Sequence, residues 1–195
     1  MIPAVFLFLL LFMAYQKPKL LHLPVHAEVE AKEPSSTATP TPNNSPVTHG
    51  VPIHITIPVI NVDAAIIPMG ASKNDIMEAP SSITDVGWYK LGVFPGDGGS
   101  ALLDGHVDGK NGEPGVFANL SELQPKDQIT VNDEDGNLTH FTVREVWTYK
   151  PNVDTEELFN QGDGAHLILI TCNGSWDAVK HSYTKRLVVI ADAGI

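Results

Sequence analysis

Three residues of this sequence could together perform acyl transfer: Cys172, His106 and Arg186. Cys172 is the only cysteine of the chain and ends its most apolar run, Ala165 to Cys172. A thiolate can attack a carbonyl carbon, an imidazolium can protonate the leaving amine, and a guanidinium can stabilise the oxyanion or hold the substrate backbone. The set indicates a nucleophilic cysteine enzyme if the fold brings the three side chains together.

Each of these residues also has a purely structural interpretation when it is taken alone. A single cysteine in an apolar strand is more often buried and inert, and most histidines are structural. His106 follows Gly105 between a strand and a glycine-rich loop, and Arg186 opens the last predicted strand, so a hairpin can return Arg186 to Cys172. Because a nearby cation lowers the pKa of a thiol, we expect Arg186 and protonated His106 to favour the thiolate of Cys172.

The elements that must position these residues are short and β-rich. From residue 51 to 195, strand-like segments alternate with glycine and proline breaks, and they are expected over 53–60, 64–69, 99–107, 127–132, 140–149, 165–172 and 185–191. The Asp-Gly step in 133–137 predicts a hairpin turn, because it supplies a positive φ. Short helices are expected within 70–82, 115–123 and 155–160. Seven or eight short strands with little helix indicate a closed barrel or a sandwich.

The first 50 residues predict an anchor and a spacer ahead of this domain. Residues 1–16 are almost wholly apolar, but the run is shorter than the ~20 residues of a comfortable bilayer span, so we expect a signal peptide core or a signal-anchor. Residues 17–50 are rich in Pro, Ser and Thr, as in an extended tether. We therefore expect a protein at the extracytoplasmic face of the cell membrane, or a secreted one if the segment is cleaved.

Charge and cysteine content restrict the partners. The net charge of −11 argues against nucleic acid, because phosphate binding needs a basic surface. The single cysteine cannot form an internal disulfide, and in an oxidising compartment, where cysteines are usually paired, it suggests a working thiol. The acids at 133–135 are explained by the hairpin turn, so we expect no metal site there and no cofactor.

The order and context of the three residues resemble those of the sortases, the cysteine transpeptidases of bacterial surfaces. Ile168 to Cys172 is similar to the family signature T-L-x-T-C, with Ile168 in place of the first Thr. Gly105-His106 is similar to the family's Gly-His, and Arg186 lies at the family's position in the final strand. The run from Gly105 to Leu120 is similar to the class E and class F-like branch. The resemblance covers roughly residues 51–192.

This resemblance implies an all-β fold, a closed eight-stranded β-barrel with a few short helices. It implies Cys172 as the nucleophile, His106 as the general acid/base, and Arg186 as the oxyanion or substrate clamp. The implied substrates are LPxTG-like sorting signals of secreted proteins, cleaved to a Cys172 thioester and transferred to an amine nucleophile such as a peptidoglycan precursor or a pilus amine. We expect Thr171, beside the nucleophile, and Trp176, in the following loop, to contact the sorting peptide.

Alternatives remain open from the residues themselves. Asp104 or Asp108 could complete a triad with His106, although we favour a solvated loop acid for both. A cysteine peptidase would hydrolyse the same thioester with water, and a non-catalytic, membrane-anchored β-barrel binding module would keep Cys172 inert. The L,D-transpeptidases also use Cys and His, but that family keeps them close in sequence, whereas His106 and Cys172 are far apart.

Overall fold

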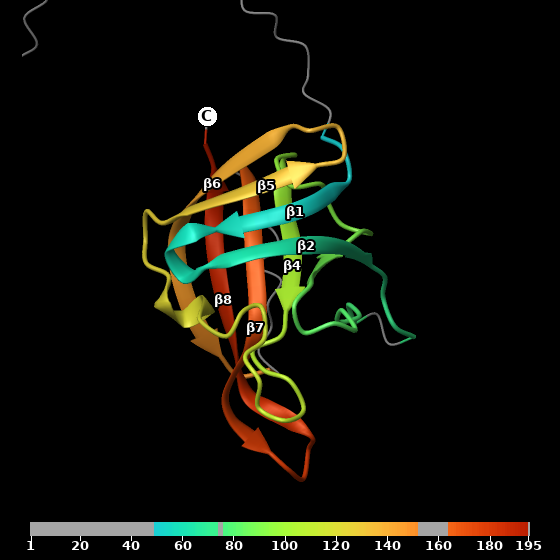
Figure 1. Cartoon of the computed structure of the whole chain (residues 1–195), viewed down its shortest axis with the longest axis vertical. Coiled ribbons are helices and arrows are strands. Elements are labelled where there is room, and N and C mark those ends of the chain that lie inside the picture. The colour runs from blue at the N-terminus through green and yellow to red at the C-terminus, as the bar shows by residue number, and fades with distance from the viewer. Residues whose placement is uncertain (1–48, 74–75, 152–163, 195) are drawn as a thin grey trace, which may run out of the picture. The chain divides into compact units, whose positions relative to one another are not determined.

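The computed structural model describes residues 49–73, 76–151 and 164–194, which form a closed barrel of eight strands (Figure 1). The strands are β1 (Pro52–Ile57), β2 (Val62–Met69), β3 (Val86–Tyr89), β4 (Gly99–Gly105), β5 (Gln128–Asp133), β6 (Leu138–Tyr149), β7 (Ala165–Asp177) and β8 (Ser182–Ala193). Two 3-10 turns also occur, η1 (Pro58–Ile60) and η2 (Leu120–Glu122). The closed eight-stranded β-barrel expected from the sequence is confirmed.

Three expectations fall on other parts of the chain. The apolar segment 1–16, nearly all of the spacer 17–50, and the helix expected at 155–160 lie outside the described residues. Within the residues that are described, no helix combines the length and the apolar character needed to cross a membrane.

The barrel runs in the order β1-β2-β3-β4-β7-β8-β6-β5. Neighbouring strands are antiparallel except for two pairs, β2–β3 and β4–β7, which are parallel. In the β4–β7 pair, Leu103 lies opposite Leu169 and Asp104 opposite Ile170. The two strands therefore reach the same end of the barrel together, and the residues that follow β4 emerge beside the second half of β7.

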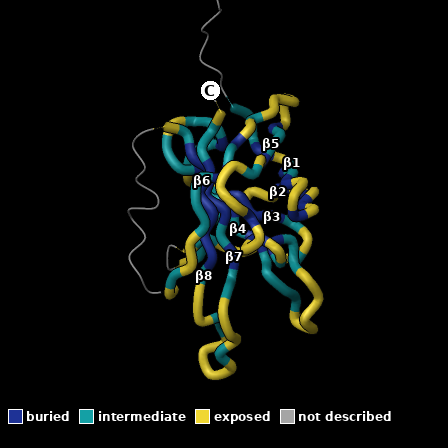
Figure 2. The backbone as a smooth tube through the Cα atoms, turned by 90° about the vertical axis from the view of Figure 1, so that its left-hand side faces the viewer, coloured by how far each residue is buried: buried dark blue, intermediate teal, exposed yellow. Residues whose placement is uncertain are grey.

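Strand β7 is apolar on both faces, which explains why its sequence is a continuous hydrophobic run. Leu167 and Leu169 point into the barrel and belong to the main core. Ile168 points outward, where it packs with Val188 and Ile190 of β8 in a second small cluster. Because side chains alternate along a strand, Cys172 falls on this outer face together with Ile168. Figure 2 shows the buried residues along the barrel wall and the exposed hairpin beyond it.

The final hairpin is longer than its sequence predicts. β7 continues past Cys172 to Asp177, and β8 begins at Ser182, so both strands project beyond the barrel (Figure 1). Arg186 thus lies within β8 rather than at its start, and Trp176 lies on a strand rather than in a loop. The polar residues after Cys172 predict a loop. In the structure, a β-bulge between Asn173 and Trp176 shifts the register, and β7 pairs with β8 again from Trp176 opposite Tyr183.

Two further expectations are wrong. The sequence pattern predicts no strand at β3, yet Val86 to Tyr89 pairs with both β2 and β4. The helix expected within 70–82 is absent from the described part of that segment, which instead contains a bridge between Ala71 and Met77. β3 is only four residues long and contains Gly87, where a Cβ atom would come within 2.7 Å of the Met69 side chain. So short a strand, with a glycine kept for close packing, gives little periodic signal.

The predicted hairpin turn between β5 and β6 is confirmed, with Gly136 at a φ of 85°. Asp133 organises it by accepting hydrogen bonds from the Asn137 side-chain amide (2.8 Å) and the Asn137 backbone N–H (2.8 Å). The backbone N–H groups of Gly50 (3.0 Å) and Asp135 (3.0 Å) also donate to it. The Asn137 amide and these backbone donors lower the pKa of Asp133 to about 2. Asp133 therefore ties the start of the domain to this turn.

We expect Asp133→Ala to lower the free energy of unfolding at neutral pH, because Gly50, Asp135 and Asn137 lose their shared acceptor. The folded-state pKa lies below the ordinary 3.8, so this contribution is present above about pH 3.8 and is lost as the pH falls toward 2. Urea unfolding of the wild type and Asp133→Ala between pH 7 and pH 2 measures it. The difference should shrink on acidification. Asp135→Ala is the matched control, and a gap that persists at pH 2 contradicts this account.

Candidate active site

Cys172 lies half-buried on the outer face of β7, directly opposite Arg186 of β8. Leu169 and Thr171 are buried in the barrel, so the alternation along β7 turns Cys172 outward. The hairpin expected to return Arg186 to Cys172 does so through strand pairing. The two side chains share one sheet face, which puts a guanidinium charge near the thiol.

His106 follows the end of β4 and lines the same pocket as Cys172. The parallel register pairs Asp104 with Ile170, and its continuation brings position 106 level with Cys172. His106 Nε2 donates a hydrogen bond to the Pro80 carbonyl (2.8 Å), because a carbonyl oxygen only accepts. A neutral His106 therefore keeps Nδ1 as its basic nitrogen.

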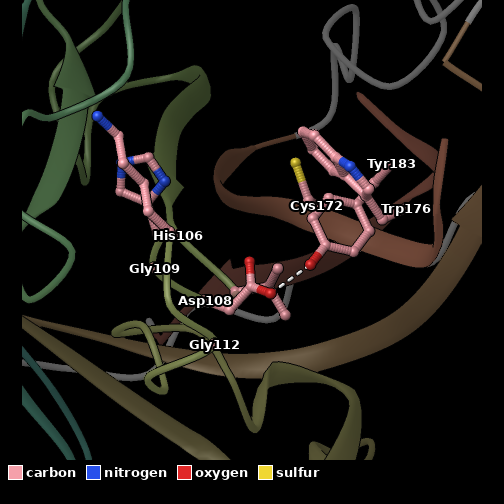
Figure 3. Close-up of a pocket in the computed structure, with 9 residues that line it drawn as sticks. His106, Asp108, Gly109, Gly112, Cys172, Trp176 and Tyr183 are labelled. Atoms are coloured by element: carbon pink, nitrogen blue, oxygen red, sulfur yellow. Dashed lines mark hydrogen bonds between the residues drawn. The ribbon is translucent and has the colours of Figure 1, made fainter. Parts of the chain in front are cut away.

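The thiol and the imidazole face each other across the pocket without touching. Its volume is about 520 Å³, and Figure 3 shows His106 on one side and Cys172, Trp176 and Tyr183 on the other. Within the described part of the chain, no hydrogen bond joins His106 to Cys172. The pocket walls are the loop after β4 and the β7–β8 hairpin, and the Tyr183 hydroxyl crosses between them to donate to the Asp108 carboxylate.

The pKa of the Cys172 thiol results from opposing contributions. Burial raises the pKa of the Cys172 thiol above its ordinary value, and the carboxylates of Asp104 and Asp108 raise it further. The Arg186 charge lowers this pKa, as expected, but burial outweighs it. The expected effect of Arg186 is therefore present, but burial and the two carboxylates leave the pKa of the Cys172 thiol above its ordinary value.

Asp104 lies on β4 and its carboxyl is largely desolvated, so the solvated loop acid is the wrong interpretation of this residue, whereas Asp108 lies in the loop after β4 and is partly buried. Burial raises the pKa of Asp104, while the charges of His106 and Arg186 lower it. Asp104 sits on the outer face of β4 and makes no hydrogen bond to His106 within the described ranges, so no triad is formed. Asp108 is partly buried and accepts the hydrogen bond from Tyr183.

The structure corrects the expected role of Thr171. Its side chain points into the barrel, is only 2% exposed, and donates a hydrogen bond to the Gly105 carbonyl (2.7 Å). A substrate on the outer face cannot reach it. Thr171 instead joins β7, which carries the thiol, to the end of β4, which carries His106.

A second contact fixes the backbone at His106 from the other side. The Phe117 N–H donates to the His106 carbonyl (2.9 Å), and the Phe117 ring packs under Gly105. A Cβ atom at Gly105 would lie 2.5 Å from that ring, so the packing requires glycine here. Glycine at position 105 is therefore explained by packing against Phe117, and histidine at position 106 by its chemistry.

Trp176 and Arg186 occupy the hairpin arm. Trp176 is 55% exposed, lines the pocket, and packs edge-on against Tyr183 with ring centroids 5.4 Å apart. Its contact with a sorting peptide stays a prediction. The Arg186 guanidinium donates to the carbonyls of Lys185 (2.9 Å) and Tyr183 (3.2 Å) and to the Ser182 hydroxyl (3.4 Å). The arginine is thus held by the hairpin's own backbone.

Sequence reasoning missed Tyr183 as a member of this site. Tyr183 and Asp108 are 75 residues apart, and nothing in the local pattern around either one signals their contact. Their hydrogen bond raises the pKa of Tyr183 to about 12, so the phenol remains a donor at neutral pH. Only the extension of β8 beyond the barrel brings Tyr183 to the pocket.

We expect alkylation of native Cys172 by iodoacetamide to follow an apparent pKa above 9.0, because burial and the nearby carboxylates oppose the thiolate. Arg186→Gln should raise that pKa further, since it removes the cation that lowers it. The measurement is the alkylation rate against pH by mass spectrometry. Arg144→Gln, the other arginine, is the control and should leave the profile unchanged. A wild-type pKa well below 9.0 would contradict the burial argument.

We expect Thr171→Val to lower the free energy of unfolding by about 1 kcal/mol, because a buried hydroxyl donor is removed while the side-chain volume is kept. Urea unfolding measures this loss. Thr171→Ser keeps the hydroxyl that joins β7 to the end of β4 beside His106. We therefore expect this variant to retain more catalytic activity than Thr171→Val. Equal activities of the two variants would show that the hydrogen bond does not position the site.

Comparisons with known proteins agree with this architecture. The family model described as Sortase domain matches residues 55–193. The fold is similar to that of sortase A from Corynebacterium diphtheriae, a lid mutant, with a TM-score of 0.58 and 23% identity over 78% of this chain and 75% of that chain. Sortase C-1 from Actinomyces oris gives a TM-score of 0.58 and 23% identity over 73% and 71%.

A third solved structure, the Clostridium perfringens Sortase D5 transpeptidase, gives a TM-score of 0.55 and 21% identity over 76% of this chain and 82% of that chain. No curated protein matches the chain. At these identities the solved structures support the fold, and the family model, which spans most of the chain, supports the family. The chain belongs to the sortase family of cysteine transpeptidases.

Proposed function

We propose that this sortase cleaves LPxTG-like sorting signals of surface proteins through a thioester on Cys172 and transfers the acyl group to an amine. The observation that carries the proposal is that Cys172 and His106 line the same pocket, with Arg186 opposite the thiol on β8. The sequence run from Gly105 to Leu120 favours the class E or class F-like branch.

The first half-reaction requires the Cys172 proton to leave. In this proposal His106 Nδ1 takes it, the thiolate attacks the scissile carbonyl carbon, and the imidazolium returns the proton to the departing amine. The product is an acyl thioester on Cys172. Burial opposes loss of the Cys172 proton. A bound sorting peptide that brings the thiol and the imidazole closer together would promote transfer of this proton to His106.

Arg186 contributes in two ways: its charge acts on the Cys172 thiol, and its guanidinium can donate a hydrogen bond to the oxyanion. Its charge already lowers the thiol pKa from its present position. A hydrogen bond to the oxyanion requires the side chain to change partners, because the guanidinium now donates to the Lys185 and Tyr183 carbonyls of the hairpin. We propose that substrate binding exchanges at least one of these bonds for the developing oxyanion.

The second half-reaction separates transfer from hydrolysis. Attack by an amine of a peptidoglycan precursor or a pilus subunit gives a transpeptidase, and attack by water gives a peptidase. We propose transfer at the extracytoplasmic face of the membrane, with residues 1–16 as anchor and 17–50 as spacer. A non-catalytic binding module is the alternative, and the half-exposed thiol in an open pocket counts against it.

We expect incubation with a panel of LPxTG-like peptides to give a thioester adduct on Cys172, and addition of triglycine to convert it to a transfer product. Cys172→Ala should abolish turnover, while His106→Ala and Arg186→Ala should lower it by about 10²–10⁴-fold. Mass spectrometry follows both products. Arg144→Gln is the control with activity retained. Full activity of Cys172→Ala, or protection of the native thiol from all reagents, would end this proposal.

A further inference from the structure

The pocket that holds Cys172 also holds a carboxylate that no cation of the described chain neutralises. Asp108 is partly buried and accepts a hydrogen bond from the Tyr183 hydroxyl. Within the described ranges it makes no ion pair, although Lys110 lines the same pocket. A negative group here can attract a positively charged ligand into the pocket.

This charge does not assist the thiol. Asp108 raises the pKa of Cys172 and so opposes the thiolate that begins the reaction. Tyr183 donates to Asp108 and remains protonated near neutral pH, since its pKa rises to about 12. The Asp108 carboxylate is thus held by the Tyr183 hydroxyl, and its charge opposes formation of the thiolate that begins acylation. We therefore expect its role in the second half-reaction, the attack on the Cys172 thioester.

A carboxylate binds a primary ammonium group through charge-assisted hydrogen bonds. Trp176, edge-on to Tyr183 in the wall of the same pocket, offers an aromatic surface to such a cation. We propose that Asp108, oriented by Tyr183, binds the ammonium group of the acceptor amine beside the Cys172 thioester. The inference rests on the transpeptidase function proposed above and names the residue that favours an amine over water.

The transfer step balances with these groups. The bound ammonium gives one proton to neutral His106 at Nδ1, and the freed nitrogen lone pair attacks the thioester carbonyl carbon. The C–S bond then breaks with its electron pair on Cys172 Sγ, which takes the second proton lost by the nitrogen. The products are an amide, the thiol, and an imidazolium that releases its proton to water.

Two small nucleophiles of different charge test this assignment. Glycinamide carries an ammonium group near pH 7, whereas hydroxylamine is neutral. For transfer of an LPxTG-like peptide, we expect Asp108→Asn to raise the KM of glycinamide about tenfold and that of hydroxylamine by less than twofold, because only the former loses a charge-assisted hydrogen bond. Tyr183→Phe should raise the glycinamide KM to a smaller extent. Asp135→Asn, in the β5–β6 turn, is the matched control.

The thiol supplies a readout that a merely damaged structure would not give. Asp108→Asn should lower the apparent pKa of Cys172 alkylation while transfer to glycinamide weakens. Equal KM changes for both nucleophiles, or none, would overturn the assignment and leave the thioester chemistry intact. Absence of any wild-type thioester would instead remove the proposed function. If Asp108→Asn fails to fold, added salt should raise the wild-type KM for glycinamide alone, and equal salt effects overturn the assignment.

Discussion

The parallel pairing of β4 with β7 is the constraint on which the site depends. Its register sets Asp104 opposite Ile170, so the chain leaves β4 at the level where β7 presents Cys172. The buried hydrogen bond from Thr171 to Gly105 ties the two strands at that level. Parallel strands need a long crossover, and here it spans β5 and β6, which is why His106 and Cys172 are distant in sequence.

The outer face of β4, β7 and β8 combines opposing electrostatic effects in a small area. Burial and two carboxylates favour the neutral thiol of Cys172, and one guanidinium favours the thiolate. Because the thiolate is the reactive species of a cysteine, these contributions together control the reactivity of Cys172.

The β7–β8 hairpin carries several contributions to this face. It holds the Arg186 guanidinium through backbone carbonyls, and it presents Trp176 and Tyr183 to the pocket. The Tyr183–Asp108 hydrogen bond joins this arm to the loop after β4. This hydrogen bond restrains the projecting β7–β8 hairpin at the pocket, so a change in the position of the hairpin would change the shape of the pocket.

The sequence alone was enough to predict most strand positions and the β5–β6 turn, its resemblance to the sortases implied the barrel, and it singled out Cys172, His106 and Arg186 as the candidate site. These depend on local periodicity, on turn chemistry, and on motifs that lie within one segment. Tertiary structure decided what depends on neighbours distant in sequence: the strand β3, the inward side of Thr171, and the raised pKa of Cys172. The reason is physical, because desolvation and cross-strand contact depend on what the folded barrel places around a side chain. The contact of Tyr183 on β8 with Asp108 in the loop after β4 forms only when the fold brings these two segments together.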